Sequence, residues 1–298
     1  MMQTFKRGAL ALILGTILAG CGGGGGDVAS PVANSLEVPT LASTAPAVQG
    51  HYARLNDVRA AMGLTTLNWN AALATAAQAH ADYQRLNNVQ GHGEVQGLPG
   101  FTGVGYGDRA ARAGYSGLLV GESIIGGTPQ SDQEGRDLMD VILAAPGHRT
   151  VLLAHEFNEI GVGAAPMTNV LGQRGTQWVD PARVSAYPYH GQSGVLTAFA
   201  PASESPNPLP GVALTGMPLS LHGSMFNSFV VTGATLVATV GASPVALLAN
   251  ADVGQSRSAF VFYPAAALTP NTAYTFTAQV NVAGSARTIT SAFTTGGF

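Results

Sequence analysis

The chain has 298 residues and a formal net charge of −3; only 10% of its residues are charged, whereas 46% are hydrophobic. These apolar residues suffice for a sizeable core, and the length favours about two domains. Lys6 is the only lysine, and the chain after position 20 carries 11 arginines against 16 acidic residues. If residues 1–20 are removed, as argued next, no lysine remains, which excludes a Schiff-base lysine and a Walker-A phosphate clamp. We expect no nucleic-acid partner because there is no basic stripe to neutralise phosphates.

The N-terminus has the pattern of an export signal. Lys6 and Arg7 precede an apolar run over residues 8–20, which is too short to span a membrane. Residues 18–21, Leu-Ala-Gly-Cys, resemble the bacterial lipobox, in which the cysteine is lipidated after cleavage. The resemblance implies a signal peptide at residues 1–20 and attachment to a membrane through lipidated Cys21. Because Gly22 follows the cysteine, it implies an outer membrane lipoprotein that faces the periplasm or the surface. An ordinary secretory signal is the alternative.

The next part of the chain reads as a tether followed by an α+β domain. Residues 21–48 are rich in Gly, Ser and Pro, which favours a flexible tether. Apolar spacing predicts helices at about residues 51–62, 69–86 and 132–145, with Asn68 or Asn70 as the cap of the second. The glycine-rich stretch over residues 91–127 predicts irregular structure, including a surface loop at 101–115. The alternative for residues 101–115 is that they line a cleft. Residues 161–163 and 176–179 predict strands.

A second domain is expected after the proline-rich segment that begins at Glu204. Apolar and polar residues alternate over 274–280, and strands are also predicted at 229–240, 259–263 and 286–294. Residues 268–274, Leu-Thr-Pro-Asn-Thr-Ala-Tyr, resemble the L-x-P-x-T-x-Y corner of fibronectin-III and bacterial immunoglobulin-like modules. That resemblance implies a small all-β sandwich at residues 204–298.

Three glycine-flanked segments carry ionisable side chains that suit chemistry. They contain His92 with Glu94, Glu122 with Ser123, and His148 with Arg149. Two imidazoles and a carboxylate form the ligand set of many sites for zinc or another divalent cation, with a further position for water. The same groups suit acid–base catalysis, with Glu122 as the base.

The order of these segments resembles the CAP superfamily (cysteine-rich secretory proteins, antigen 5, pathogenesis-related 1), in its bacterial SCP-like branch. The resemblance covers about residues 50–200 and rests on four segments: Gly-His-Gly-Glu at 91–94, Gly-Glu-Ser at 121–123, Ala-Pro-Gly-His-Arg at 145–149, and Ile-Gly-Val-Gly at 160–163. It implies a CAP domain at residues 49–203, folded as an α-β-α sandwich. It also implies a cleft of two histidines and two acidic residues that can hold a divalent cation.

Carried onto this chain, His92, Glu122 and His148 take three of those four places. Where eukaryotic members have the second acidic residue, near the Pro-Gly-His element, this chain has Ala145 and bacterial members commonly have Ser. Glu94 is our candidate for the missing carboxylate. Ser123 and Arg149 are further candidates for the cleft.

The remaining histidines suggest structural roles. His80 lies on the buried stripe of its helix and is expected to be a hydrogen-bonded core residue. His51, His190 and His222 stand alone in turn-like contexts. His155 and Glu156 begin H-E-x-x-E, which lacks the second histidine of zinc proteases.

Three functions follow from these patterns. We favour an exported, lipid-anchored binding module whose ligand is a lipid, a polymer or a protein. The first alternative is a metal-assisted hydrolase of peptides or cell-wall polymer, and the second is an adhesion or spacer protein acting through the C-terminal β domain. The lack of a nucleophile and of a complete acid–base pair favours binding over catalysis.

Overall fold

The computed structural model describes residues 40–175, 180, 182–226, 229–249 and 258–297. The predicted signal peptide, Cys21, most of the predicted tether and the strand expected at residues 176–179 lie outside the described residues. Among the helices that are described, none is both long and apolar enough to cross a membrane.

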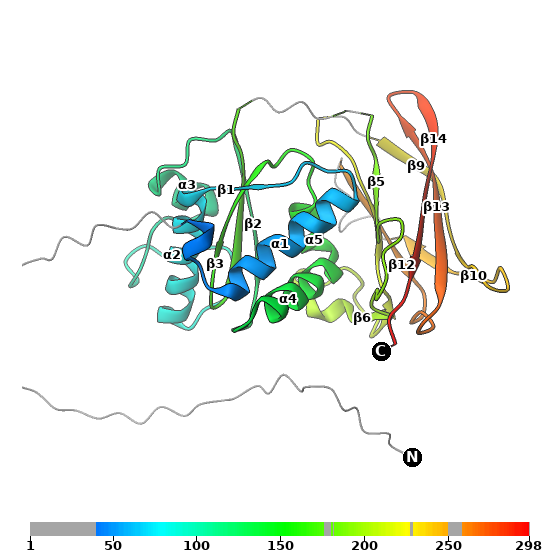
Figure 1. Ribbon diagram of the computed structural model, residues 1–298, viewed down its shortest axis with the longest axis horizontal. Coiled ribbons are helices and arrows are strands. Elements are labelled where there is room, and N and C mark those ends of the chain that lie inside the picture. The colour runs from blue at the N-terminus through cyan, green and yellow to red at the C-terminus, as the bar shows by residue number, and fades with distance from the viewer. Residues whose placement is uncertain (1–39, 176–179, 181, 227–228, 250–257, 298) are drawn as a thin grey trace, which may run out of the picture. The chain divides into compact units, whose positions relative to one another are not determined.

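A four-stranded sheet lies between two layers of helices in the first part of the described chain (Figure 1). Its order is β1 (Asn68–Trp69), β3 (Glu159–Gly163), β4 (Met167–Gln173) and β2 (Leu119–Ile125). Strand β1 is parallel to β3, and the other neighbours are antiparallel. One face is covered by α2 (Ala71–Asn87) and α3 (Tyr106–Arg112), and the other by α1 (Pro46–Ala61), α4 (Asp132–Ala144) and α5 (Pro146–Leu152). The predicted α-β-α layering is confirmed.

Local capping explains where the helices begin. The Asn70 side chain accepts from the backbone N–H of Leu73 at 3.1 Å and caps α2, one of the two predicted caps. Helix α4 is capped in the same way by Ser131. Proline occupies the first position of α1 and α5, where its missing N–H costs no hydrogen bond.

The stretch over residues 91–127 is more ordered than its composition predicts. It contains α3 and β2. The prediction of a surface loop at residues 101–115 was therefore wrong for Tyr106–Arg112, which form α3. Arg109 of α3 is almost completely buried, and the helix packs against α2 and β2. Tertiary contacts therefore stabilise a helix whose glycine-rich surroundings hide it in the sequence.

Glycines let α2 lie directly on β3. A Cβ atom on Gly161 would overlap the backbone of Leu73 and Ala74, and one on Gly163 would lie 2.5 Å from the carbonyl carbon of Ala77. The Ile-Gly-Val-Gly segment is thus explained by packing, because any larger residue would push the helix off the sheet.

The second part of the described chain contains two antiparallel four-stranded sheets. The first has the order β11 (Leu247–Ala249), β12 (Ala259–Pro264), β8 (Leu219–His222) and β5 (Ser185–Tyr187). The second has the order β10 (Pro244–Val245), β9 (Phe229–Ala238), β13 (Ala273–Val282) and β14 (Ser285–Thr294). The short strands β6 (Ala198–Phe199) and β7 (Thr215–Gly216) pair separately, and 3-10 turns occur at η1 (Leu41–Ser43) and η2 (Pro201–Ser203).

The two sheets pack face to face through aromatic side chains. The ring centroids of Phe262 and Phe276 are 5.7 Å apart, and those of Phe229 and Phe260 are 4.9 Å apart. In β13, Tyr274, Phe276, Ala278 and Val280 are buried in alternation with more exposed residues, which confirms the predicted half-buried strand.

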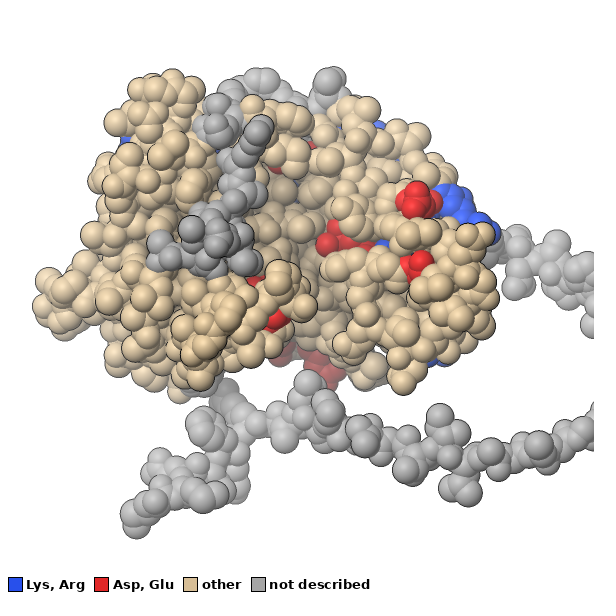
Figure 2. Space-filling view, turned by 180° about the vertical axis from the view of Figure 1, so that it is seen from behind, with Lys and Arg blue, Asp and Glu red and all other residues tan. Residues whose placement is uncertain are grey.

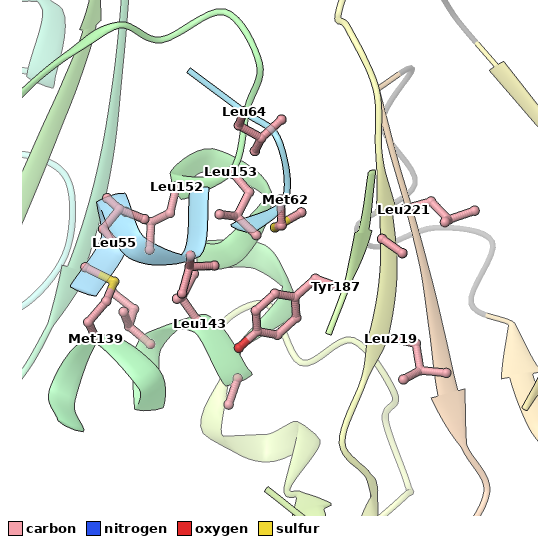
Figure 3. Packing of buried hydrophobic residues seen from close by; sticks show 14 of the residues in the cluster. Leu55, Met62, Leu64, Met139, Leu143, Leu152, Leu153, Tyr187, Leu219 and Leu221 are labelled. Carbon is pink, nitrogen blue, oxygen red and sulfur yellow. The ribbon is translucent and has the colours of Figure 1, made fainter. Parts of the chain in front are cut away.

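The helical layer of α1, α4 and α5 lies between the first sheet and β5 (Figure 1, Figure 3). Tyr187 of β5 shares one apolar core with Leu143 of α4 and Leu153, which follows α5. Strand β5 precedes the predicted boundary at Glu204 and yet pairs with β8, which follows it. The C-terminal sheets therefore recruit a strand from before that boundary, and both sides of the boundary contribute to one core.

Charged side chains are sparse on the face shown in Figure 2, where they are set among uncharged residues. Long-range electrostatic steering of a charged partner toward this face is correspondingly weak.

Candidate functional site

A cleft of about 210 Å³ opens beside β2, the edge strand of the first sheet. Its lining comes from four separate parts of the chain: His92, Glu122, Gly147, His148, Val151, Glu204, Ser205 and Pro206. The structure thus brings together the three residues predicted as metal ligands, although His92 and His148 are far apart in the sequence. It adds a carboxylate, Glu204, that the sequence analysis did not assign to the site.

Glu122 is held on both of its oxygens. Its side chain has no exposed surface; Oε1 lies 2.9 Å from Nδ1 of His92, and Oε2 accepts from an Arg109 guanidinium N–H at 2.7 Å. Arg109 also donates to the backbone carbonyl of His92 at 3.0 Å. Glu122 is therefore arranged to orient His92, whose own side chain is 55% exposed toward solvent.

Glu94 lies behind Glu122 and does not line the cleft. Its Oε1 is 2.9 Å from Nδ1 of His80, and its Oε2 accepts from the backbone N–H of Thr102 at 2.6 Å. The Arg109 Nε atom is 3.8 Å from Oε1. Glu94 thus ties the segment after α2 to that helix, and it does not replace the missing carboxylate of the cleft.

His80 is buried, as predicted, and it also contacts polar groups of the segment that follows α2. Its Nδ1 faces Glu94 and its Nε2 lies 2.9 Å from the carbonyl of Gly91. Both ring nitrogens of His80 are therefore engaged by other buried groups. His80 and Arg109 therefore both lie against the carboxylates of Glu94 and Glu122 in one buried cluster.

His148 meets Glu204 near the start of α5. Its Nδ1 lies 3.2 Å from Oε1 of Glu204, and the same oxygen accepts from the backbone N–H of Gly147 at 2.7 Å. Glu204 was placed only at the predicted domain boundary, because nothing in its spacing relative to His148 marks it as a site residue. The Ser-Pro residues after it were the sole signal, and they indicate a turn rather than a ligand.

Ser123 and Arg149, the other candidates for the cleft, lie elsewhere. Ser123 follows Glu122 on β2, is buried, and accepts on its carbonyl from the Asn169 side chain at 3.2 Å. Arg149 points from α5 toward the C-terminal sheets: it donates to the Pro218 carbonyl at 3.0 Å and lies 4.6 Å above the Tyr187 ring. Burial lowers the pKa of Arg149 to about 10. Its role is to join α5 to the second part of the chain.

The donor set fits a divalent cation through the imidazoles. Each Nδ1 is paired with a carboxylate, and neither Nε2 has a hydrogen bond to the described residues. A carboxylate that holds one nitrogen of a metal-binding histidine is a common arrangement, because it fixes the ring and its tautomer. Within the described part of the chain, no three His, Asp or Glu side chains already converge as a metal site. Two imidazoles and water molecules are thus the ligands that this conformation offers.

Residues 52–177 match the family model of CAP, the Cysteine-rich secretory protein family. Among solved structures, the chain is similar to an extracellular protein containing a SCP domain from Bacillus anthracis str. Ames, at 27% identity and a TM-score of 0.37, over 43% of this chain and 40% of that one. It is also similar to an outer surface protein from Borrelia burgdorferi, at 17% identity and a TM-score of 0.36, over 43% of this chain and 93% of that one. No curated protein matches the chain. The chain spans less than half the length of the first of these structures, and the family match covers the α-β-α layers and the three predicted cleft residues.

Proposed function

Because residues 52–177 match the CAP family model, we propose that this protein is an exported, lipid-anchored binding module whose cleft takes a divalent cation such as zinc. His92 and His148 hold the cation through their Nε2 atoms. One observation carries this proposal: the two histidines line one cleft and each has its Nδ1 paired with a carboxylate. Glu122 and Glu204 then act as positioning residues rather than as ligands.

The residues around the cleft would orient the metal-binding histidine and leave room for a ligand. Glu122 orients His92, and Arg109 neutralises the buried charge of Glu122. A bound zinc ion supplies an open coordination position for an oxygen or nitrogen atom of a ligand. A lipid headgroup, a polymer or a segment of a partner protein that carries such an atom can bind there.

Binding is favoured over hydrolysis by the state of Glu122. The hydrolase alternative needs this carboxylate as a base, but its side chain is fully buried and both oxygens are already engaged by His92 and Arg109. A base must reach the water that it activates. If the protein were a hydrolase, Glu122→Gln would abolish hydrolysis of a peptide or cell-wall polymer while the metal stayed bound.

Anchoring and export rest on the N-terminal pattern. The apolar run over residues 8–20 and Cys21 support lipidation, which would hold the cleft near an outer membrane at ~0.8 kcal/mol for each buried CH₂ group of the acyl chains. The tether between Cys21 and α1 gives the cleft reach toward a ligand. Mass spectrometry of the membrane fraction tests this: a diacylglyceryl adduct on Cys21 is expected, and a chain cleaved without it contradicts anchoring.

The C-terminal sheets support an immunoglobulin-like module. Their two antiparallel sheets pack face to face, and the Tyr274 hydroxyl accepts from the backbone N–H of Thr269 at 2.9 Å. This contact lies in the L-x-P-x-T-x-Y segment and has the character of a tyrosine corner. The adhesion alternative would need a ligand for these sheets, whereas their packing against α5 gives them a part in supporting the cleft.

Zinc titration by calorimetry on the full chain tests the proposed site. We expect stoichiometric binding that is lost in the double variant His92→Ala, His148→Ala. The exposed histidine variant His190→Ala is the matched control and should bind as the parent does. Absence of binding in the parent, or full retention in the double variant, would exclude this site.

A further inference from the structure

The cleft contains a carboxylate that the CAP match does not include, because Glu204 lies beyond residue 177. Its side chain is only 4% exposed. Oε1 lies 3.2 Å from Nδ1 of His148 and accepts from the N–H of Gly147 at 2.7 Å. Burying a carboxylate is costly unless hydrogen bonds or charges compensate it, so its place here needs a reason.

The second carboxylate oxygen of Glu204 gives a reason for this carboxylate to be buried beside the cleft. Oε2 is buried and has no hydrogen-bond partner among the described residues. An unpaired buried acceptor destabilises the folded protein, and a hydrogen-bond donor of a ligand bound in the cleft would satisfy it. Glu204 lines the same cleft as His92 and His148, so its carboxylate lies beside the proposed site.

The surroundings of Glu204 come from the C-terminal sheets. It follows η2, and its N–H donates to the carbonyl of Pro201 at 3.2 Å. Phe199 of β6 and Tyr263 of β12 pack in one small cluster with Val261, and Ala145 packs against it. Burial and the nearby charge of Glu204 raise the pKa of Tyr263. The segment that carries Glu204 is therefore held by the second part of the chain.

Ala145 and Gly147 show how the segment fits α5. Ala145, the residue before α5, packs against the cluster of Phe199, Val261 and Tyr263 that supports Glu204. A Cβ atom on Gly147 would lie 2.9 Å from Oε1 of Glu204. A glycine at 147 lets the carboxylate reach the helix start, where its oxygen can bond both the backbone N–H and the imidazole.

From these contacts we infer that Glu204 is the second carboxylate of the cleft: it positions His148 by accepting from its Nδ1–H, so that Nε2 is left free for a cation. The C-terminal part of the chain thus completes a site that the CAP domain lacks by itself. The metal-related part of this inference rests on the proposed function, and the contact with His148 does not.

The test compares Glu204→Gln and Glu204→Ala with the parent in two measurements. The first is the tautomer of His148 in the metal-free protein, read from its ring nitrogen and carbon chemical shifts at alkaline pH. The parent and Glu204→Gln keep an acceptor for Nδ1–H, so both should show the Nδ1–H tautomer. Glu204→Ala removes the acceptor, and the tautomer should revert toward Nε2–H.

The second measurement is the dissociation constant of zinc. Loss of an orienting carboxylate should weaken binding about 10–100-fold in Glu204→Ala, and loss of its charge should weaken it about tenfold in Glu204→Gln. The control is Asp57→Asn, which removes the same charge from an exposed side chain on α1 and should leave zinc affinity unchanged. Near-ultraviolet circular dichroism confirms that each variant is folded.

The outcomes separate the two proposals. If the His148 tautomer is unchanged in Glu204→Ala, the inference is overturned whatever zinc does. If the tautomer reverts but the parent binds no zinc, the positioning role stands and the proposed metal function fails. Equal zinc affinity in the parent and Glu204→Ala overturns the role of Glu204 at the metal site.

Discussion

His51 should make the protein sensitive to mild acid. It lies within α1 with no exposed surface, its Nδ1 lies 3.1 Å from the carbonyl of Gly135, and its Nε2 is buried with no partner among the described residues. Burial lowers the pKa of His51 from 6.5 to about 4, against the smaller opposing effects of the Gly135 carbonyl and the Asn169 side chain. The folded protein therefore resists protonation of this ring.

The sign and size of the effect follow from proton linkage. Between about pH 4 and 6.5 the unfolded chain binds a proton at His51 and the folded chain does not. The free energy of unfolding is therefore independent of His51 protonation above about pH 6.5, where the ring is neutral in both states. It falls as the pH drops toward 4, because only the unfolded chain gains the proton. Each tenfold difference in proton affinity is worth ~1.4 kcal/mol, so His51 alone should account for a loss of ~3 kcal/mol.

Urea unfolding at a series of pH values between about 7 and 4.5 measures this loss. The variant His51→Gln keeps a donor for Gly135 and removes the titrating ring, so the slope of unfolding free energy against pH should fall by up to ~1.4 kcal/mol per pH unit. The exposed control His190→Gln should leave the slope unchanged. His155 and His222 are also buried and contribute equally to the parent and both variants. Equal slopes in His51→Gln and the parent would refute the reasoning.

Two further substitutions test the support of the site and the packing of the sheet. Arg109→Met removes the guanidinium that pairs with the buried carboxylate of Glu122 and lies beside Glu94, and it should lower the unfolding free energy by ~3–5 kcal/mol. Urea unfolding should show a loss below ~1 kcal/mol for the exposed control Arg112→Met, and a similar loss for both would contradict the buried ion pair. Gly161→Ala should cost ~3 kcal/mol because its methyl group overlaps the α2 backbone. Gly107→Ala, with open space around it, should change stability by no more than ~1 kcal/mol, and equal effects at the two glycines would contradict close helix–strand packing.

Helices with strong local signals were predicted well. Helix α2 begins at Ala71 after the Asn70 cap, and α4 spans Asp132–Ala144 against the predicted 132–145. These boundaries depend on capping side chains and apolar spacing, which are properties of neighbouring residues. Helix α3 was missed because its main stabilising contacts, such as those of Arg109 with Glu122, join residues that are distant along the chain.

Burial of polar residues could not be predicted from isolated positions. His51 and His222 were placed in turn-like contexts, yet both are buried, one inside α1 and the other at the end of β8. Glu94 was a candidate for the cleft and instead lies one layer behind it. The residues next to a polar side chain in the sequence do not indicate which hydrogen-bond partners allow its burial, since those partners come from other elements.

The sequence by itself was enough to predict the α-β-α layers and the grouping of His92, Glu122 and His148, because these residues lie in segments that the CAP family model also matches. Only the tertiary structure showed that Glu204 joins them and that β5 crosses the expected boundary. Hydrophobic periodicity and turn residues act over a few positions, and they decide where helices and strands form. Which of those elements pack together depends on burying their apolar faces in one core, and that packing carries Glu204 to His148 across 56 residues.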